Sequence, residues 1–337
     1  MFLTFKKRKF IAAAAVLTTV FFAGYAARWL GEKREGQEAN PPMQELRLRG
    51  YDFINPLLEC DESAQSIGSQ TLEPFKQKVE LLIDESKKKN WVNHTSVYFR
   101  EMNNGLAIDI DGQEKFTPAS LIKVPILIAY LKAAESNPGL MKKMLTFTLE
   151  DNDGVQNTKP AEALKTGKSY SVQDLLFRMI VYSENNSYFL LLSDIDRNIL
   201  HRVYTDLGLA VPNVRNPGDF MTVTEYASFF RVLFNASYLN KEMSEKAMEY
   251  LTAVDYKEGL VGGVPPGTIV AHKFGENAMG SDQEIKQLHD CGVVYYPKHP
   301  YLLCVMTRGD SFEYLDDTIK DISRLVYEEV NRNYRER

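Results

Sequence analysis

The chain has 337 residues, of which 44% are hydrophobic and 25% are charged, and its formal net charge is −5. This composition is typical of a globular protein with one or two domains and enough apolar material for a sizeable core. No basic domain stands out, so nucleic acid is not expected as a partner.

The N-terminus has the pattern of an export signal. Basic residues at positions 7–9 precede an apolar run over residues 10–30, which is about long enough to span a bilayer. We therefore expect residues 1–30 to be either a cleaved signal peptide or an uncleaved signal anchor. Both alternatives place the rest of the chain outside the cytoplasm, because the basic cluster stays inside. The expected location is periplasmic or extracytoplasmic, with anchoring in the inner membrane through residues 10–30 if the signal is not cleaved.

Residues 31–71 are expected to form a linker followed by an extended segment that packs onto the next domain. The linker prediction rests on the polar, charged and proline-containing composition of residues 31–45. The remaining residues, 72–337, are expected to form the catalytic domain.

The chain has three cysteines, Cys60, Cys291 and Cys304. An odd count forbids complete pairing, and so few cysteines do not make a disulfide framework. Cys291 and Cys304 lie in strand-like runs, so we expect them to be small buried hydrophobic residues.

The first part of the domain predicts a helix, a hairpin and a second helix. Apolar residues on one face predict a helix over residues 73–89. Two strand-like runs, 95–99 and 106–110, flank an Asn-Asn-Gly turn signal at 103–105. A helix is then expected to open at Pro118, because proline suits the first helical position.

The second part predicts a helical block, three strands and a final helix. The block runs to about residue 260, and within it Ser171 and Thr222 have the pattern of helix N-caps. The later elements are expected over residues 269–273, 291–296 and 301–307 as strands and over about 314–333 as an amphipathic helix.

Strands from both ends of the domain can complete one antiparallel five-stranded sheet flanked by helices. The expected fold class is therefore α/β (α+β), with the helical block forming an all-helical lobe. A site is expected in a cleft between the sheet and the lobe.

Three short motifs fall on the edges of that expected cleft. The first is Ser120-x-x-Lys123 at a helix start, where unpaired backbone N–H groups and the helix dipole favour a developing negative charge. Lys123 lies one turn further on and can act as the base that a serine nucleophile needs. The same spacing occurs at Ser86 and Lys89 without companion motifs, so the spacing alone is not specific.

The other two motifs lie further along the chain. Ser183-Glu184-Asn185 follows a predicted helix, and its serine hydroxyl could relay protons while its Asn amide holds a substrate carbonyl. Lys273-Phe274-Gly275 lies at the end of a predicted strand and offers a second ammonium group. Its glycine would let a ligand lie along the strand edge. Each motif alone also fits an ordinary helix end or strand end.

In this order and spacing, the three motifs resemble those of penicillin-binding proteins and class A β-lactamases. Flanking sequence is also similar to that family. Residues 170–192 resemble the helix that leads into its second motif, and residues 216–235 resemble the end of its omega loop with the following helix. Residues 289–309 resemble its last two strands, and the resemblance extends over about residues 72–335.

The resemblance implies a role for each motif residue. Ser120 would be the acyl-accepting nucleophile, and Lys123 would be its general base or proton relay. Ser183 would pass a proton to the leaving nitrogen, and Asn185 would bind the substrate amide. Lys273 would attract the substrate carboxylate.

The third motif and the residue after it would also shape the oxyanion hole. Gly275 belongs to the motif, and the backbone N–H groups of Ser120 and Glu276 would bind the oxyanion. The Glu276 carboxylate is in addition a candidate surrogate for the group that activates the deacylating water. The family implies no cofactor and no metal.

The chain departs from the family pattern at two important places. Phe274 stands where the family has a Thr or Ser whose hydroxyl binds the substrate carboxylate. The segment 207–218 has no carboxylate, whereas the omega loop of class A enzymes carries a Glu and an Asn that hold the hydrolytic water. Asp206 and Asp219 flank this segment, and neither is assigned that role. A smaller departure is Glu184, at a position where the family usually has Asp and is tolerant.

The implied function is an exported serine acyl-hydrolase that hydrolyses the β-lactam amide through an acyl-Ser120 intermediate, with slow deacylation. One alternative is a D,D-peptidase or penicillin-binding protein acting on cell-wall peptides, which shares the motifs and lacks the omega-loop glutamate. A non-enzyme alternative is a penicillin-binding sensor or a degenerate scaffold. The expected partners are a small-molecule β-lactam or a cell-wall peptide, and the membrane if the N-terminal segment is uncleaved.

Overall fold

A computed structural model describes residues 46–48, 50–59, 65–148, 163–212, 218–280 and 283–335. The predicted signal or anchor over residues 1–30 and the predicted linker over 31–45 lie outside the described residues. Among the helices of the described ranges, none is long and apolar enough to cross a membrane.

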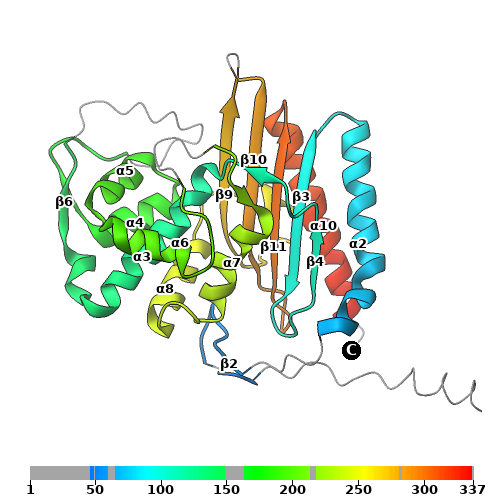
Figure 1. Ribbon diagram of the computed structural model, residues 1–337, viewed down its shortest axis with the longest axis horizontal. Helices are drawn as coiled ribbons and strands as arrows, with labels where there is room; N and C mark the ends of the chain where they lie inside the picture. The colour runs from blue at the N-terminus through cyan, green and yellow to red at the C-terminus, as the bar shows by residue number, and fades with distance from the viewer. Residues whose placement is uncertain are drawn as a thin grey trace, which may run out of the picture. The chain divides into compact units, whose positions relative to one another are not determined.

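Five antiparallel strands form the central sheet in the order β4-β3-β11-β10-β9 (Figure 1). The predicted class, an antiparallel five-stranded sheet flanked by helices, is therefore confirmed. Strands from both ends of the domain meet where β11 pairs with β3. The strands are β3 (His94–Glu101), β4 (Ala107–Ile110), β9 (Val270–Met279), β10 (Ile285–Val294) and β11 (Tyr301–Gly309).

Strand β9 is longer than the sequence predicts, and this changes the setting of one motif. The pattern predicts a strand that ends at Lys273, but β9 runs to Met279 and pairs with β10 over its whole length. The Lys-Phe-Gly motif therefore lies inside an edge strand and not at a strand end. The second half of β9 contains polar residues and a glycine, so it lacks the alternating apolar pattern that predicts a strand. Backbone pairing with β10 makes that half a strand.

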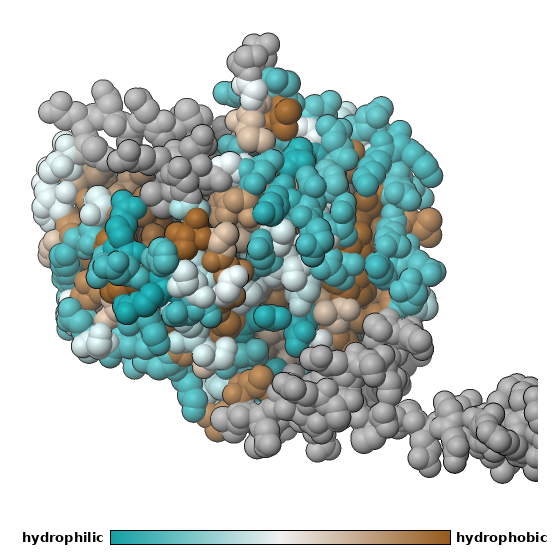
Figure 2. All heavy atoms as spheres, in the orientation of Figure 1, coloured by the Kyte–Doolittle hydropathy of each residue, from teal (hydrophilic) through white to brown (hydrophobic). Residues whose placement is uncertain are grey.

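Helices α2 (Gln65–Lys88) and α10 (Phe312–Arg335) cover one face of the sheet (Figure 1). Val97 and Phe99 point to this side, as alternation along β3 requires, and they pack with α10 residues such as Ile319. Each such buried side chain contributes roughly 1.5–3 kcal/mol of transfer free energy. The outer surface of these helices is predominantly hydrophilic in Figure 2, as expected for amphipathic helices.

The helix predicted over residues 73–89 begins earlier in the structure, at Gln65. Residues 65–72 have no apolar period that would signal a helix, and Pro74 would normally mark a helix start. The C-terminal helix predicted over about 314–333 is present as α10.

The other face of the sheet packs against the helical lobe through a large apolar core that includes Phe229, Leu302 and Met306. Ser171 and Thr222 are N-caps, as predicted: Ser171 Oγ accepts from the backbone N–H of Asp174, and Thr222 forms a capping box with Glu225. The helices of this part are α3 (Lys123–Ser136), α4 (Val172–Val181), α5 (Asn185–Asp194), α6 (Arg197–Thr205), α7 (Val223–Phe234), α8 (Lys241–Thr252) and α9 (Gly259–Gly263), with the 3₁₀ turns η2 (Ala119–Ile122) and η3 (Pro138–Lys142).

Four short strands of the lobe form two small two-stranded sheets. Each of these sheets joins segments that are distant in the chain. In the first sheet, the segment ahead of Ser120 pairs with the residues that precede α7; in the second, the residues after η3 pair with those that precede α4. The pairs are β5 (Lys115–Phe116) with β8 (Met221–Thr222), and β6 (Met144–Thr146) with β7 (Ser169–Ser171).

The segment ahead of α2 contacts the helical lobe. Its short strands β1 (Leu46–Arg47) and β2 (Leu57–Glu59) pair with each other. The Glu245 carboxylate on α8 accepts hydrogen bonds from consecutive backbone N–H groups at 52–54. Asn55 N–H donates to the Phe234 carbonyl at the end of α7 (2.8 Å). These backbone contacts hold the extended segment on the domain.

Cys291 and Cys304 are completely buried, as predicted, but they form a disulfide between β10 and β11, which the sequence analysis did not predict. They are directly opposite in the antiparallel register, with Cα atoms 4.0 Å apart. This pairing depends on strand register, which cysteine spacing does not reveal. Cys60 lies outside the described residues.

Candidate active site

Ser120 lies in the 3₁₀ turn η2, directly ahead of α3. The sequence predicts Pro118 at the first position of this helix, but Pro118 precedes the 3₁₀ turn, and α3 begins only at Lys123. Ala119 between them has a φ of +50°, a left-handed conformation that costs an alanine about 1 kcal/mol. Such strain persists only where the surroundings hold the backbone in place, as at many functional sites.

Thr117, two residues ahead of this turn, is anchored through three groups. Its backbone N–H donates to Gln287 Oε1 (3.0 Å), and its hydroxyl donates to Asp219 Oδ1 (2.6 Å). Its carbonyl accepts from His289 Nε2 (3.0 Å). The Thr307 N–H donates to His289 Nδ1 (3.2 Å), so the His289 proton is on Nε2. Strand β10 thereby fixes the chain that enters the Ser120 turn.

His289 is completely buried, and burial lowers the pKa of its imidazole to about 4, against smaller upward effects of its backbone hydrogen bonds. The neutral tautomer therefore persists at neutral pH. Neither Thr117 nor His289 carries a sequence signal for this role, because the contact joins residues far apart in the chain.

Lys123 brings the first two motifs together. Its Nζ lies 3.0 Å from Ser120 Oγ and 3.1 Å from Ser183 Oγ. It lies 2.5 Å from the Ser183 carbonyl oxygen and 2.7 Å from Asn185 Oδ1. The predicted residues of the first two motifs thus surround one nitrogen atom.

The protonation state of Lys123 follows from its burial and neighbours. Burial lowers its pKa well below the usual value, the Lys273 charge lowers it further, and the carboxylates of Glu184 and Glu276 act against this. A neutral amine has two N–H donors and one lone pair. The Ser183 carbonyl and Asn185 Oδ1 are acceptors only, so they take both donors. The lone pair is then left for a hydroxyl, and Ser120 Oγ is in reach.

Ser183 lies between the two lysines. Its hydroxyl oxygen accepts from Lys273 Nζ (3.0 Å) and is 3.1 Å from Lys123 Nζ. The residue has a φ of +53° in the bend between α4 and α5. A hydroxyl in this position can pass a proton from one amine to the other, or to a leaving group in front of it.

Glu184 holds the second motif in place, a role that the sequence analysis missed. It is the N-cap of α5: its carboxylate accepts from the backbone N–H groups of Asn186 (3.1 Å) and Ser187 (2.6 Å). It is 1% exposed. This cap orients Asn185, the first residue of α5, toward Lys123. The signal was available, because an acidic residue directly ahead of a helix is a common cap.

Lys273 is fully buried on β9, and burial lowers its pKa to about 7, while Asp290 and Glu276 act in the opposite direction. Its Nζ donates to Ser183 Oγ and to the Phe274 carbonyl (2.9 Å). The third motif therefore joins the other two, as the sequence predicts.

Phe274 faces the protein interior and not the solvent. It is 3% exposed, its ring stacks on Tyr256 at a centroid distance of 4.1 Å, and Lys273 Nζ lies 4.2 Å from the ring centroid. At the position where the family resemblance implies a Thr or Ser hydroxyl, an aromatic ring therefore lies beside Lys273.

Gly275 permits close contact between β9 and the Ser120 turn. A Cβ atom there would lie 2.8 Å from the Pro118 carbonyl oxygen and 3.1 Å from Leu121 N. The glycine is thus required by η2 itself, in addition to any ligand on the strand edge. The contact brings Ser120 and the next strand residue, Glu276, onto adjoining segments, which is the arrangement that the oxyanion-hole prediction needs.

The two aspartates that flank the omega-like segment are engaged elsewhere. Asp206 accepts from the Tyr238 hydroxyl (2.9 Å). Asp219 accepts from Thr117 and is paired with Arg308 (2.9 Å). Both contacts agree with leaving these residues out of the deacylation step. Residues 213–217 of this segment lie outside the described residues.

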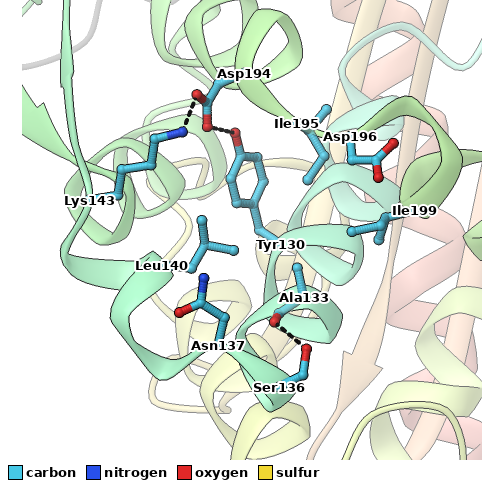
Figure 3. Close-up of a pocket in the computed structure, with 10 residues that line it drawn as sticks. All are labelled: Tyr130, Ala133, Ser136, Asn137, Leu140, Lys143, Asp194, Ile195, Asp196 and Ile199. Atoms are coloured by element: carbon cyan, nitrogen blue, oxygen red, sulfur yellow. Dashed lines mark hydrogen bonds and ion pairs between the residues drawn. The ribbon is translucent and has the colours of Figure 1, made fainter.

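A pocket of roughly 290 Å³ lies further along α3, away from Ser120 (Figure 3). Its Lys143 is paired with Asp194, and the Tyr130 hydroxyl donates to the Leu191 carbonyl (2.9 Å). Its Ser136 hydroxyl donates to a backbone carbonyl of the same helix. Because these groups are already paired with protein atoms, this pocket lacks an activated nucleophile.

The fold and the Ser–Lys–Ser–Lys arrangement define a class of serine enzymes that transfer acyl groups. Residues 74–330 match the model of the β-lactamase enzyme family. Since this match covers most of the chain, the protein belongs to the β-lactamase enzyme family. A search of curated proteins found no match.

Solved structures of the same fold include penicillin-binding and β-lactamase proteins. A point mutant of PBP-A, in an acyl-enzyme complex with penicillin G, is 21% identical with a TM-score of 0.66, covering 77% of this chain and 97% of that one. The class A β-lactamase from Mycobacterium abscessus is 20% identical with a TM-score of 0.65, covering 76% and 99%. The β-lactamase from Sphaerobacter thermophilus is 17% identical with a TM-score of 0.64, covering 76% and 97%. At these identities the likeness establishes the fold.

Proposed function

We propose that this protein is a serine hydrolase that opens the amide bond of β-lactams through an acyl-Ser120 intermediate and releases the acyl group slowly. The observation that carries the proposal is the position of Lys123 Nζ, 3.0 Å from Ser120 Oγ, with two acceptor-only oxygens occupying its N–H groups. Burial and the Lys273 charge lower the pKa of Lys123, and once the lysine is neutral this arrangement leaves its lone pair to take the serine proton.

In the acylation step, Lys123 takes the hydroxyl proton of Ser120 while Oγ attacks the carbonyl carbon. The backbone N–H groups of Ser120 and Glu276 stabilise the oxyanion. When the C–N bond breaks, the Ser183 hydroxyl gives its proton to the leaving nitrogen, and Lys123 returns the proton it took to Ser183. The lysine is then neutral again and the acyl group is an ester of Ser120.

Slow deacylation follows from the groups that flank the site. The segment 207–218 has no carboxylate, and Asp206 and Asp219 are held by other partners. A water molecule that attacks the ester then lacks the omega-loop carboxylate that activates it in the family this chain resembles, and the surrogate candidate Glu276 lies outside that segment. This supports slow turnover, as in a penicillin-binding protein, in which the acyl-enzyme forms faster than it is hydrolysed.

The proposal is tested by mixing the purified protein with penicillin G and following its intact mass over time. We expect a mass increase of one penicillin that decays over many minutes or longer, with slow appearance of penicilloic acid. Rapid release would favour an efficient β-lactamase. A permanent adduct together with cleavage of D-alanyl-D-alanine peptides would favour the D,D-peptidase alternative.

Two variants separate catalysis from chance labelling. Ser120→Ala should abolish the adduct, whereas Ser86→Ala should retain it, because Ser86 has a lysine at the same spacing but is buried beside α2 backbone (4% exposed). An adduct that persists in Ser120→Ala would contradict the nucleophile assignment. The absence of any adduct in the wild type would favour the degenerate-scaffold alternative.

Export is part of the same proposal and rests on the basic cluster at 7–9 and the apolar run over 10–30. A fusion of residues 1–45 to alkaline phosphatase, which is active only outside the cytoplasm, should be active in cells. Replacing the three basic residues by glutamate should reduce that activity.

A further inference from the structure

Strand β10 supports the candidate active site through alternate side chains of one face. Gln287 Oε1 accepts from the Thr117 N–H (3.0 Å), and His289 Nε2 donates to the Thr117 carbonyl (3.0 Å). Cys291 is the next residue on this face, because side chains alternate along a strand. Its disulfide with Cys304 therefore lies in the row of side chains that supports the nucleophile turn.

Cys291 lies between its disulfide partner and a lysine of the site. It is directly opposite Cys304 in the β10–β11 ladder and directly opposite Lys273 in the β10–β9 ladder. Side chains at such positions share a face of the sheet, with Cβ atoms about 4.5–5.5 Å apart. All three residues are completely buried in a close-packed interior. The Lys273 side chain therefore begins beside the disulfide.

The amine at the end of the Lys273 side chain belongs to the proposed proton path. Its Nζ lies 3.0 Å from Ser183 Oγ and 2.9 Å from the Phe274 carbonyl oxygen. Ser183 Oγ is also 3.1 Å from Lys123 Nζ. A group that attracts Lys273 Nζ away from Ser183 therefore disturbs the hydroxyl that gives its proton to the leaving nitrogen.

The oxidation state of Cys291 decides whether its sulfur competes for this amine. A disulfide sulfur has no proton to give. A thiol beside an amine can transfer its proton to nitrogen, which gives a thiolate and an ammonium ion, and a neighbouring cation favours the thiolate. Little water screens these two charges around the buried Lys273, so they attract each other strongly. The other charged groups that act on Lys273 are the same in both oxidation states: Lys123, Glu276 and Asp290.

Reduction by a dithiol converts one state into the other. The two thiols of the reductant supply two electrons and two protons. The S–S bond between Cys291 and Cys304 breaks, two S–H groups form, and a disulfide forms in the reductant. Both cysteines are completely buried, so the folded chain protects the bond from a reductant in solution. The oxidation state is therefore set while the chain folds.

We propose that Cys291 is a redox-dependent positioning residue for Lys273. In the disulfide it leaves Lys273 Nζ to Ser183, whereas as a thiol it draws the amine away and slows the acylation of Ser120. The effect on acylation rests on the proposed function. A chain that folds in a reducing compartment is then less active than one that folds in an oxidising compartment.

The test compares two variants that both lose the disulfide but keep different thiols. Cys304→Ala keeps a thiol beside Lys273, whereas Cys291→Ala keeps one a strand further away. Both are made in a Cys60→Ser background, which excludes pairing with the third cysteine. The second-order rate of acylation by penicillin G is measured by intact mass at pH 8 under argon. We expect Cys304→Ala to react at least fivefold more slowly than Cys291→Ala.

A rescue separates this role from the loss of a cross-link. The double variant Cys291→Ala/Cys304→Ala has no thiol, so we expect its rate to lie within twofold of Cys291→Ala and above that of Cys304→Ala. A purely structural disulfide predicts the opposite order, because the double variant loses the most buried side-chain atoms. Equal rates in the two single variants, or no rescue in the double variant, would overturn the inference.

A spectroscopic measurement makes the test independent of acylation. In protein labelled with carbon-13 at lysine Cε, the Lys273 signal reports whether the amine is charged, and its absence in Lys273→Met assigns it. At pH 8 we expect a charged amine in Cys304→Ala and a largely neutral amine in Cys291→Ala and in the disulfide form. The Cys60→Ser protein refolded with a dithiol reductant needs no change at 291 or 304 and should resemble Cys304→Ala.

The two measurements distinguish the failure of this inference from the failure of the proposed function. If no form is acylated but the charge of Lys273 differs as expected, the proposed function fails and the role of Cys291 stands. The same charge state in all forms would overturn the inference even if Ser120 is acylated.

Discussion

Lys123 Nζ lies 2.7 Å from Asn185 Oδ1, an oxygen that accepts hydrogen bonds but cannot donate one. Together with the Ser183 carbonyl, this oxygen occupies the N–H groups of a neutral lysine and leaves the lone pair for a hydroxyl. In the proposed mechanism, the base that activates Ser120 is therefore defined by a contact between the first and second motifs.

A carboxylate in place of the Asn185 amide should favour the charged form of Lys123 and raise its pKa. In Asn185→Asp, we expect the pH at which the acylation rate reaches half its plateau to rise by about one unit, as for one added charge near a lysine. The rate is measured with a neutral β-lactam amide between pH 5 and 9. Asn137→Asp, at an exposed position beyond the end of α3, is the matched control and should leave the profile unchanged. A profile of Asn185→Asp that overlays the wild type would contradict this account of the base.

Lys273 should make stability depend on pH above neutrality. Its pKa is about 7 when folded and 10.5 as a free side chain, so the unfolded chain binds more protons between these values. The contribution of Lys273 to the free energy of unfolding is therefore lowest below pH 7 and rises as pH increases toward 10.5. In Lys273→Met, this part of the rise is removed. We expect the unfolding free energy of the wild type to gain about 2–3 kcal/mol relative to the variant between pH 7 and pH 9. The unfolding free energies are measured by urea unfolding at each pH. If wild type and Lys273→Met show the same dependence on pH, Lys273 is not responsible for the rise.

His289 should act on the acid side. Its pKa is about 4 in the folded protein and 6.5 as a free side chain, so the unfolded chain takes up the extra proton as pH falls. Stability is thus lost from about pH 6.5 down to about pH 4, by at most about 3 kcal/mol from this group. His289→Gln should flatten that part of the urea-derived stability profile, whereas His201→Gln, at an exposed site, should not. If both variants keep the wild-type slope, His289 is not the group responsible.

Gly275 tests how closely β9 approaches the nucleophile turn. A Cβ atom there would overlap the Pro118 carbonyl oxygen at 2.8 Å, and backbone must move to accommodate it. We expect Gly275→Ala to lower stability by about 1–3 kcal/mol, in the range of overpacked interiors, and to slow acylation at least tenfold. Gly139→Ala is the control, because its nearest neighbour would be a side-chain oxygen at 3.4 Å. Thermal unfolding and acylation rates measured on both variants decide the matter, and a fully active Gly275→Ala would count against the close contact.

The sequence predicts what local patterns determine. Helix caps and short motifs depend on a few neighbouring residues. The predicted N-caps at Ser171 and Thr222 are present, and Lys123 Nζ lies close to Ser120 Oγ, as the spacing predicts. The order of the strands along the chain can also be predicted from the sequence, because alternating apolar residues and turn signals mark most of them.

What the sequence could not predict depends on pairing between distant residues. The second half of β9 is a strand because it pairs with β10, as Glu276 does with Leu288. The Cys291–Cys304 disulfide follows from the register between β10 and β11. The contact of His289 with Thr117 spans 172 positions and has no local signature.

The most direct test of the central claim is to locate the acyl group. The protein is treated with penicillin G, quenched in acid and digested, and the peptide with the added mass is sequenced by tandem mass spectrometry. We predict one penicilloyl group, on Ser120, and none in Ser120→Ala. A modification on another residue, or an equal adduct in the alanine variant, would contradict the claim that Ser120 and Lys123 form the nucleophile and its base.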